Sequence, residues 1–202
     1  MSQPLKLGFL ASRNGSSLRA IVAAIEAGAL NAQPCLAVSN NRTAPALAFA
    51  AERGIPTLHI ATQGDPEAAD AALAAAMESA GVELIVLSGY LRRLGPRTLS
   101  RYRNRVLNIH PGPLPRFGGE GMYGHRVHEA VIAAGVAESG CAIHLVDEEY
   151  DRGPILAQLS VPVAPGETAD SLEAKVTARE PGFFVETLKR IASGELVLPP
   201  TN

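Results

Sequence analysis

The chain has 202 residues, of which 47% are hydrophobic, so it is long enough to bury a core unaided. Its formal net charge is −2 and it has no basic block, which argues against nucleic acid as a partner. No apolar run approaches membrane-spanning length and no signal peptide is recognisable, so we expect a cytoplasmic protein without a membrane partner. Cys35 and Cys141 lie in apolar stretches and are expected to be reduced core thiols, since nothing else supports a disulfide.

The first half of the chain alternates apolar strand patterns with helical ones. Strands are expected over 5–11, 34–39, 56–60 and 82–87, and helices over 18–25, 44–53, 66–80 and 96–102. The nearly continuous apolar run at 82–87 is typical of a sheet that is covered on both faces. The alternation therefore favours a parallel, right-handed β-α-β assembly.

A glycine–serine loop follows the first predicted strand. Asn14, Gly15, Ser16 and Ser17 would present backbone N–H groups and hydroxyls at a helix start, where an anion is favoured. The functional interpretation is a phosphate cradle, and the alternative is a serine N-cap on a surface helix. The loop matches neither of the common glycine-rich nucleotide motifs, so these residues alone leave both interpretations open.

The loop after the fourth predicted strand, 88–96, mixes apolar and cationic groups. It contains Leu91, Arg92, Arg93 and Leu94. The loop could line a pocket for a ring with a carboxylate tail, or it could carry a solvated arginine pair. Considered without context, the solvated pair is the simpler interpretation.

The stretch 105–111 organises the second half of the chain. Val106, Leu107 and Ile109 predict a short buried strand that ends in two polar residues, Asn108 and His110. Strand residues two apart point to the same face, so an amide and an imidazole should stand together at the strand end. That pairing suits acyl chemistry, although both residues could equally cap the strand with hydrogen bonds.

A long loop, 111–123, and a helix from 125 to 135 follow. The loop is rich in glycine and proline, and long loops in compact domains are usually functional, so segment 116–123 could be a lid. His125, His128 and Glu129 lie within about one helical turn of one another. Metal ligation by this cluster is conceivable, but the sequence does not place a third ligand, and surface or supporting roles are preferred.

The last third of the chain should hold two strands, an acidic loop and a broken helix. Strands are expected over 139–146 and 155–163, the second at a sheet edge, and the helix from about 168 to 191 should kink at Pro181. Between the strands, four carboxylates occur in five residues, which suggests a solvated or calcium-binding turn. The alternative turns Asp151 inward, where it would charge a histidine and raise the pKa of that histidine.

Together these pieces resemble the phosphoribosylglycinamide (glycinamide ribonucleotide) formyltransferases of purine synthesis. The resemblance rests on Asn108-x-His110-Pro111, on Asp151 followed by Gly153-Pro154, and on the loop 14–18, and it covers essentially the whole chain in the right order. It implies an α/β fold, a Rossmann-like formyltransferase fold whose parallel amino-terminal half continues into a mixed central sheet flanked by helices. It also implies a single domain over 1–202, with a phosphate-binding half (1–104) and a catalytic and folate-binding half (105–202).

The resemblance implies a role for each matching residue. Transfer of a formyl group from 10-formyltetrahydrofolate to the amine of phosphoribosylglycinamide would use Asn108, His110 and Asp151 as catalytic residues, without a metal. The nucleotide substrate would contact Asn14, Gly15, Ser16, Ser17 and Glu180. The folate co-substrate would contact Leu91, Arg92, Arg93, Leu94, Asn108, Val146, Asp147, Glu148, Glu149, Tyr150 and Asp151.

The sequence departs from the family pattern at several positions. Arg13 replaces a usual glycine, Ser17 replaces a usual asparagine, and Pro66 stands where some relatives have an arginine near the folate tail. Segment 116–123 is longer than in common members, and Pro181 interrupts a helix that usually continues. Alternatives are another folate-dependent formyltransferase or hydrolase, and a catalytically silent folate- or nucleotide-binding module. We expect small-molecule partners and a monomer or homodimer.

Overall fold

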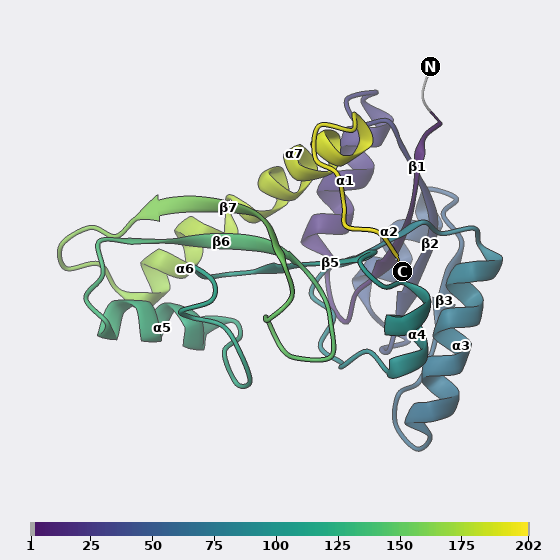
Figure 1. Ribbon diagram of the computed structural model, residues 1–202, viewed down its shortest axis with the longest axis horizontal. Helices are drawn as coiled ribbons and strands as arrows, with labels where there is room; N and C mark the ends of the chain where they lie inside the picture. The colour runs from purple at the N-terminus through teal and green to yellow at the C-terminus, as the bar shows by residue number, and fades with distance from the viewer. Residues whose placement is uncertain (1–2, 202) are drawn as a thin grey trace.

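The computed structural model describes residues 3–201 as a seven-stranded mixed sheet flanked by helices (Figure 1). In space the strands follow the order β3-β2-β1-β4-β5-β6-β7. The strands β1 to β5 are parallel to their neighbours, while β6 runs antiparallel to β5 and β7 antiparallel to β6. The strand bounds are β1 Leu5–Leu10, β2 Ala32–Ser39, β3 Thr57–His59, β4 Leu84–Leu87, β5 Val106–His110, β6 Glu138–Leu145 and β7 Ile155–Pro162.

Helices cover both faces of this sheet. Their bounds are α1 Ser16–Glu26, α2 Pro45–Glu52, α3 Pro66–Ser79, α4 Pro96–Arg101, α5 His125–Ala133, α6 Ala169–Thr177 and α7 Glu180–Ala192. Side chains of α1, α2 and α7 pack in one core cluster, and those of α3 and α4 pack in a second cluster. A third cluster joins α5 and α6 to β6 and β7, and Figure 1 shows these four elements together at one end of the molecule.

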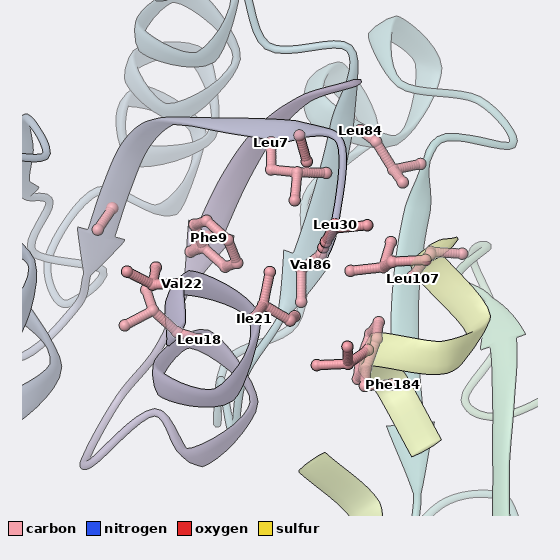
Figure 2. Packing of buried hydrophobic residues seen from close by; sticks show 14 of the residues in the cluster. Leu7, Phe9, Leu18, Ile21, Val22, Leu30, Leu84, Val86, Leu107 and Phe184 are labelled. Carbon is pink, nitrogen blue, oxygen red and sulfur yellow. The ribbon is translucent and has the colours of Figure 1, made fainter. Parts of the chain in front are cut away.

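The period of two in the parallel strands explains why two cores form. Leu84 and Val86 of β4 belong to the first cluster, whereas Ile85 and Leu87 belong to the second. Figure 2 shows the first cluster, with Phe9 of β1 beside α1 and Phe184 of α7 closing the other side. Because alternate side chains point to opposite faces, an almost unbroken apolar strand buries both faces at once.

The strand order reverses between β1 and β4, which lie side by side at the centre of the sheet. From β1 the chain moves outward through β2 and β3, and from β4 it moves outward in the other direction. The loops that leave the carboxyl ends of β1 and β4 therefore diverge and open a crevice, which is where open α/β sheets bind their ligands. The carboxyl end of β5 lies at this same edge, because β5 is parallel to β4.

The structure confirms the expected element order, the edge position of β7 and the mixed sheet after His110. The last helix differs from the expectation, because the chain breaks at 178–179 rather than at Pro181. Pro181 lies in the first turn of α7, where a missing N–H does no harm. Within residues 3–201, no helix is long and apolar enough to span a membrane.

Candidate active site

Four polar side chains meet where β5 ends. Asn108 and His110 come from β5, and the antiparallel register sets Asn108 opposite His144 of β6. The Asn108 side-chain amide lies 3.2 Å from His144 Nε2, while His144 Nδ1 donates to the Leu145 carbonyl at 2.9 Å. The fourth side chain, Asp151, comes from the loop between β6 and β7. The strand end therefore carries an amide, two imidazoles and a carboxylate in one cluster.

The Asp151 carboxylate bridges the two histidines. Its Oδ2 lies 3.3 Å from His110 Nδ1, and its Oδ1 lies 3.3 Å from His144 Nε2. Only 11% of the Asp151 side chain is exposed, so it points inward rather than into solvent, as the functional interpretation of the acidic loop expected. Asp151 has a φ of +55°, a conformation that costs a non-glycine residue about 1 kcal/mol. The loop thus accepts local strain at the residue that carries the carboxylate.

Tight packing of the acidic loop against β6 fixes the backbone around Asp151. A Cβ on Gly153 would lie only 1.9 Å from the Leu145 carbonyl oxygen, so no other residue fits there. The next residue, Pro154, accepts a hydrogen bond from the Leu145 amide at 2.9 Å. The Gly153-Pro154 pair is therefore the anchor that returns the loop to the sheet.

The long loop after β5 also contacts this cluster. The Phe117 carbonyl lies 2.6 Å from His110 Nε2, and the Gly119 amide donates to Asp151 Oδ2 at 3.1 Å. Both nitrogens of the His110 ring consequently face acceptors, the Phe117 carbonyl on one side and Asp151 on the other. Segment 116–123 is therefore joined to the cluster by two backbone groups and must move if His110 Nε2 is to contact another molecule.

Burial reverses the expected effect of Asp151 on His110. Desolvation lowers the pKa of His110 below its ordinary value and outweighs the Asp151 charge and the Phe117 carbonyl, both of which raise it. The expectation that Asp151 would raise the pKa of its histidine is therefore wrong for the net shift. For Asp151, burial acts to raise the pKa, but the hydrogen bond from His144 and the charge of His110 outweigh it, and the pKa is lowered. The Asp151 carboxylate thus stays ionised beside a histidine whose neutral form is favoured by burial.

His144 is the member of the cluster that sequence analysis missed. Its side chain is only 3% exposed and it contacts both Asp151 and Asn108. The signal was present in the chain, because this histidine lies between the apolar residues Ile143 and Leu145, next to the acidic loop. Recognising it required the antiparallel register of β5 and β6, which the pattern of a single strand does not reveal.

The glycine–serine loop lies at the carboxyl end of β1, next to the loop that follows β4. Gly15 is the N-cap of α1 with φ +67° and makes no side-chain cap, so the alternative interpretation, a serine N-cap, is not what the structure shows. Within residues 3–201, the backbone N–H groups of Ser16 and Ser17 have no hydrogen-bond partner. Asn14 and Ser16 are exposed, whereas Ser17 is buried. The helix start therefore offers two free amides to an anion.

Hydrogen bonds join the two loops of the crevice. The Leu18 amide donates to Ser88 Oγ at 2.9 Å, and the Leu91 amide donates to Ser12 Oγ at 2.8 Å. The Ser12 amide also donates to the Gly89 carbonyl at 3.2 Å. Segments 12–18 and 88–91 are thereby held as one unit, although the bonded residues are 70 or more positions apart in the chain.

A cavity of about 490 Å³ opens beside segment 90–96. Four residues of the expected folate-binding set line it, namely Arg92, Arg93, Leu94 and Glu148. Leu91 is instead more than half exposed. In the described part of the chain, the lining of this cavity does not include Leu91, Asn108, Val146, Asp147, Glu149, Tyr150, Asp151 or His110. The cavity and the polar cluster are thus neighbouring but separate parts of the crevice.

The acidic loop links these two parts. Arg93 donates a hydrogen bond to the Glu148 carbonyl, and its guanidinium lies 5.5 Å from the centre of the Tyr150 ring. The same loop carries Asp151 into the polar cluster. Pro66, one of the departures from the family pattern, also lines the cavity.

Glu180, the remaining residue of the expected substrate set, begins α7. Burial, and to a smaller extent the charge of Glu173, raises the pKa of Glu180 to about 7. Its charge in turn contributes to raising the pKa of Cys141, after the larger effect of burial, to about 12. Glu180 is therefore a half-protonated carboxyl near neutral pH, and Cys141 is an unreactive thiol.

Comparison with known proteins relates the chain to the formyl transferases. The family model described as formyl transferase matches residues 5–188. Phosphoribosylglycinamide formyltransferase of Mycobacterium tuberculosis is 37% identical over 196 residues, covering 95% of this chain and 87% of that protein. The chloroplastic enzyme of that name from Vigna unguiculata is 36% identical over 194 residues, covering 95% of this chain and 62% of that protein. The chain thus spans less than two thirds of the chloroplastic relative.

Solved structures agree with these relatives. Glycinamide ribonucleotide transformylase 1 from Symbiobacterium toebii superposes with a TM-score of 0.88 at 32% identity, covering 100% of this chain and 93% of that one. Phosphoribosylglycinamide formyltransferase from Brucella melitensis gives a TM-score of 0.85 at 34% identity, covering 97% and 100%. A formyltetrahydrofolate deformylase from Pseudomonas syringae shares the fold at 23% identity.

Proposed function

The chain belongs to the formyl transferase family, and we propose that it transfers the formyl group of 10-formyltetrahydrofolate to the amine of 5-phosphoribosylglycinamide, in de novo purine biosynthesis. The observation that carries the proposal is the buried His110–Asp151 pair, which stands beside Asn108 at the carboxyl end of β5. Relatives named phosphoribosylglycinamide formyltransferase support this choice of substrate.

The reaction needs no covalent intermediate on the protein. The substrate amine is already a nucleophile, and it attacks the formyl carbon to form a new C–N bond. Negative charge then develops on the formyl oxygen, and collapse of this intermediate breaks the bond to N10 of the folate. The amine loses one proton and N10 gains one, so the protein must stabilise an oxyanion and relay a proton.

Asn108 and His110 can stabilise the oxyanion and relay the proton. A side-chain amide has two N–H donors. One of those of Asn108 can donate to the oxyanion, a contribution worth about 10²–10³ in rate. His110, whose pKa is lowered by burial, is held in its neutral form, ready to accept a proton and return it, which is worth about 10²–10⁴ in rate. Asp151 holds the ring through Nδ1 and stabilises it when it becomes charged.

For this chemistry, segment 116–123 has to release His110. The Phe117 carbonyl occupies His110 Nε2 at 2.6 Å, so that nitrogen reaches the reacting atoms only after the loop shifts. Binding of both substrates provides the replacement partner for Nε2. The long loop therefore acts as a lid that leaves the imidazole when the ligands arrive.

The remaining residues divide between the two substrates. The free amides of Ser16 and Ser17, together with Gly15 and Asn14, would bind the phosphate at the start of α1. Glu180 would contact the rest of the ribonucleotide. The cavity along 90–96 and the loop 146–151 would hold the folate, with Arg92 and Arg93 near its carboxylates. Residues 1–202 would work as one unit, because each half supplies part of the crevice.

The test is a formyl-transfer assay with a panel of acceptors. The protein is incubated with 10-formyltetrahydrofolate and, separately, phosphoribosylglycinamide, a sugar amine without phosphate, and water alone. We expect release of the deformylated folate only with phosphoribosylglycinamide. Equal release with water alone would identify a hydrolase, and no release with any acceptor would identify a silent binding module; either result overturns the proposal.

A further inference from the structure

A second histidine–carboxylate cluster lies outside the proposed active site, where α5 packs against α6. It consists of His125 and Glu129 from α5 and of Asp170 and Glu173 from α6. We propose that this cluster binds a first-row divalent cation, for which Zn²⁺ is the best match, and that the ion braces α5 against α6. The site is structural and takes no part in formyl transfer.

The short contact between His125 and Glu173 sets the orientation of the ring. His125 Nδ1 lies 2.6 Å from Glu173 Oε2, which is a hydrogen bond with Nδ1–H as the donor. That bond fixes the proton on Nδ1 and leaves Nε2 free to act as a ligand. A carboxylate that holds the far nitrogen of a metal-bound histidine is the usual arrangement in protein metal sites.

Two further carboxylates face the free nitrogen. His125 Nε2 lies 3.8 Å from Asp170 Oδ1 and 3.8 Å from Glu129 Oε1. Ligand atoms around a tetrahedral ion with bonds of about 2.0–2.2 Å are separated by about 3.3–3.5 Å. Both distances to Nε2 therefore exceed the tetrahedral spacing by only a few tenths of an ångström. Asp170 is 93% exposed and Glu129 is 61% exposed, so both side chains have the freedom to adjust.

The donor set favours a borderline ion over a hard one. One imidazole nitrogen with two carboxylate oxygens is a donor set that zinc accepts, whereas Mg²⁺ and Ca²⁺ prefer oxygen ligands alone. Three protein ligands would leave one position for water.

The helix pattern alone could not reveal this site. The sequence pattern groups His125 with His128 and Glu129, but His128 is buried at 1% exposure. The missing ligand comes instead from Asp170, 45 residues further along the chain, with Glu173 as the supporting carboxylate. Only the packing of α6 against α5 brings these groups together.

The first test is zinc binding by the full chain after treatment with a chelator. Titration calorimetry at pH 7.5 should show one saturable site per chain, and the melting temperature should rise by about 5–10 °C at a free zinc concentration 100 times Kd. Mg²⁺ at the same concentration should produce neither effect. Absence of a saturable site, or equal binding of Mg²⁺, would overturn the proposal.

Variants then locate the bound ion. His125→Ala and the pair Glu129→Gln with Asp170→Asn should each weaken zinc binding at least about 100-fold, and Glu173→Gln should weaken it about 10–100-fold. Glu186→Gln on α7, which removes an exposed acid of another surface, is the matched control and should bind zinc normally. Circular dichroism verifies the fold of each variant.

Cobalt provides an independent readout, because Co²⁺ in such a site absorbs visible light. The visible band should appear in the wild-type protein and in Glu186→Gln and be absent in His125→Ala. Zinc binding or a cobalt band that persists unchanged in His125→Ala would place the ion elsewhere and refute the assignment.

Discussion

The two histidine–carboxylate clusters of this protein use the same chemical groups with opposite results. In the proposed active site, His110 and Asp151 are 3% and 11% exposed, and burial lowers the pKa of His110. Between α5 and α6, His125 and Glu173 are 42% and 38% exposed, and the hydrogen bond that His125 donates to Glu173 raises the pKa of His125. A carboxylate beside a histidine therefore does not by itself decide the sign of the shift.

The difference comes from the balance between desolvation and Coulomb attraction. Moving an imidazolium away from water is costly, and one partly shared carboxylate does not compensate for it in the buried cluster. At the surface, the imidazolium keeps its water and three carboxylates surround it. The buried imidazole thus stays neutral to a lower pH than an ordinary histidine and is ready to accept a proton, whereas the exposed imidazole keeps its positive charge to a higher pH.

The largest effect should follow removal of the buried imidazole. His110→Ala should lower kcat by about 10²–10⁴, because the proton relay is lost, while folate binding stays close to normal. His125→Ala, the same substitution in the exposed cluster, is the control and should keep nearly full turnover. Steady-state formyl transfer under saturating substrates measures both. Comparable losses in the two variants would remove the distinction between the clusters.

A slightly smaller effect is expected at the neighbouring amide. Asn108→Ala should lower kcat by about 10²–10³, since it removes the donor proposed for the oxyanion. Asn104→Gly, just before the amino end of β5, is a matched control, because Asn104 has φ +57° and glycine tolerates that conformation. Turnover in Asn108→Ala within threefold of wild type would show that the oxyanion is stabilised elsewhere.

Glu180 predicts a pH-dependent stability. Its pKa is raised from 4.5 to about 7 on folding, so between these values the folded state binds more protons than the unfolded state. The associated stability is full below about pH 4.5 and is lost as pH rises through 7, and the complete shift corresponds to about 3 kcal/mol. The free energy of unfolding, measured with urea, should therefore fall less between pH 5 and pH 8 for Glu180→Gln than for wild type. A fall in Glu180→Gln as large as in wild type, or as large as in the control Glu186→Gln, would contradict the raised pKa of Glu180.

The two histidines should titrate on opposite sides of 6.5, the ordinary value. For His125, whose pKa is raised, the stabilising charge is present below 6.5 and is lost as pH rises through the folded pKa. For His110, whose pKa is lowered, stability is full above 6.5 and is lost as pH falls through the folded pKa. Ring ¹⁵N NMR titration, assigned with the two alanine variants, measures both midpoints. The reverse order of the midpoints would show that burial does not dominate at His110.

Much of the fold could be predicted from the sequence, because the apolar periods of strands and helices are local properties. The run 82–87 and the helix beginning at Pro66 follow from such patterns, as does the strand end at Asn108 and His110. The break in the last helix lies before Pro181 rather than at it. The sequence does not distinguish the two positions, because a proline is as compatible with the first turn of a helix as with a kink inside one.

The parts of the site that were missed depend on contacts between distant segments. His144 joins Asn108 and Asp151 through the β5–β6 register, and the Phe117 carbonyl meets His110 through the path of a long loop. The sign of the His110 pKa shift depends on burial, which a motif does not reveal. The motif located the catalytic chemistry, but the fold determines its charge state.

The most direct measurement compares wild type with Asp151→Asn, which keeps the size of the side chain and removes its charge. Turnover of phosphoribosylglycinamide and the Kd for the folate are measured on the same preparations. If the buried His110–Asp151 pair carries formyl transfer, kcat falls by at least about 10² while the Kd changes little. Near-normal turnover in Asp151→Asn would contradict the account.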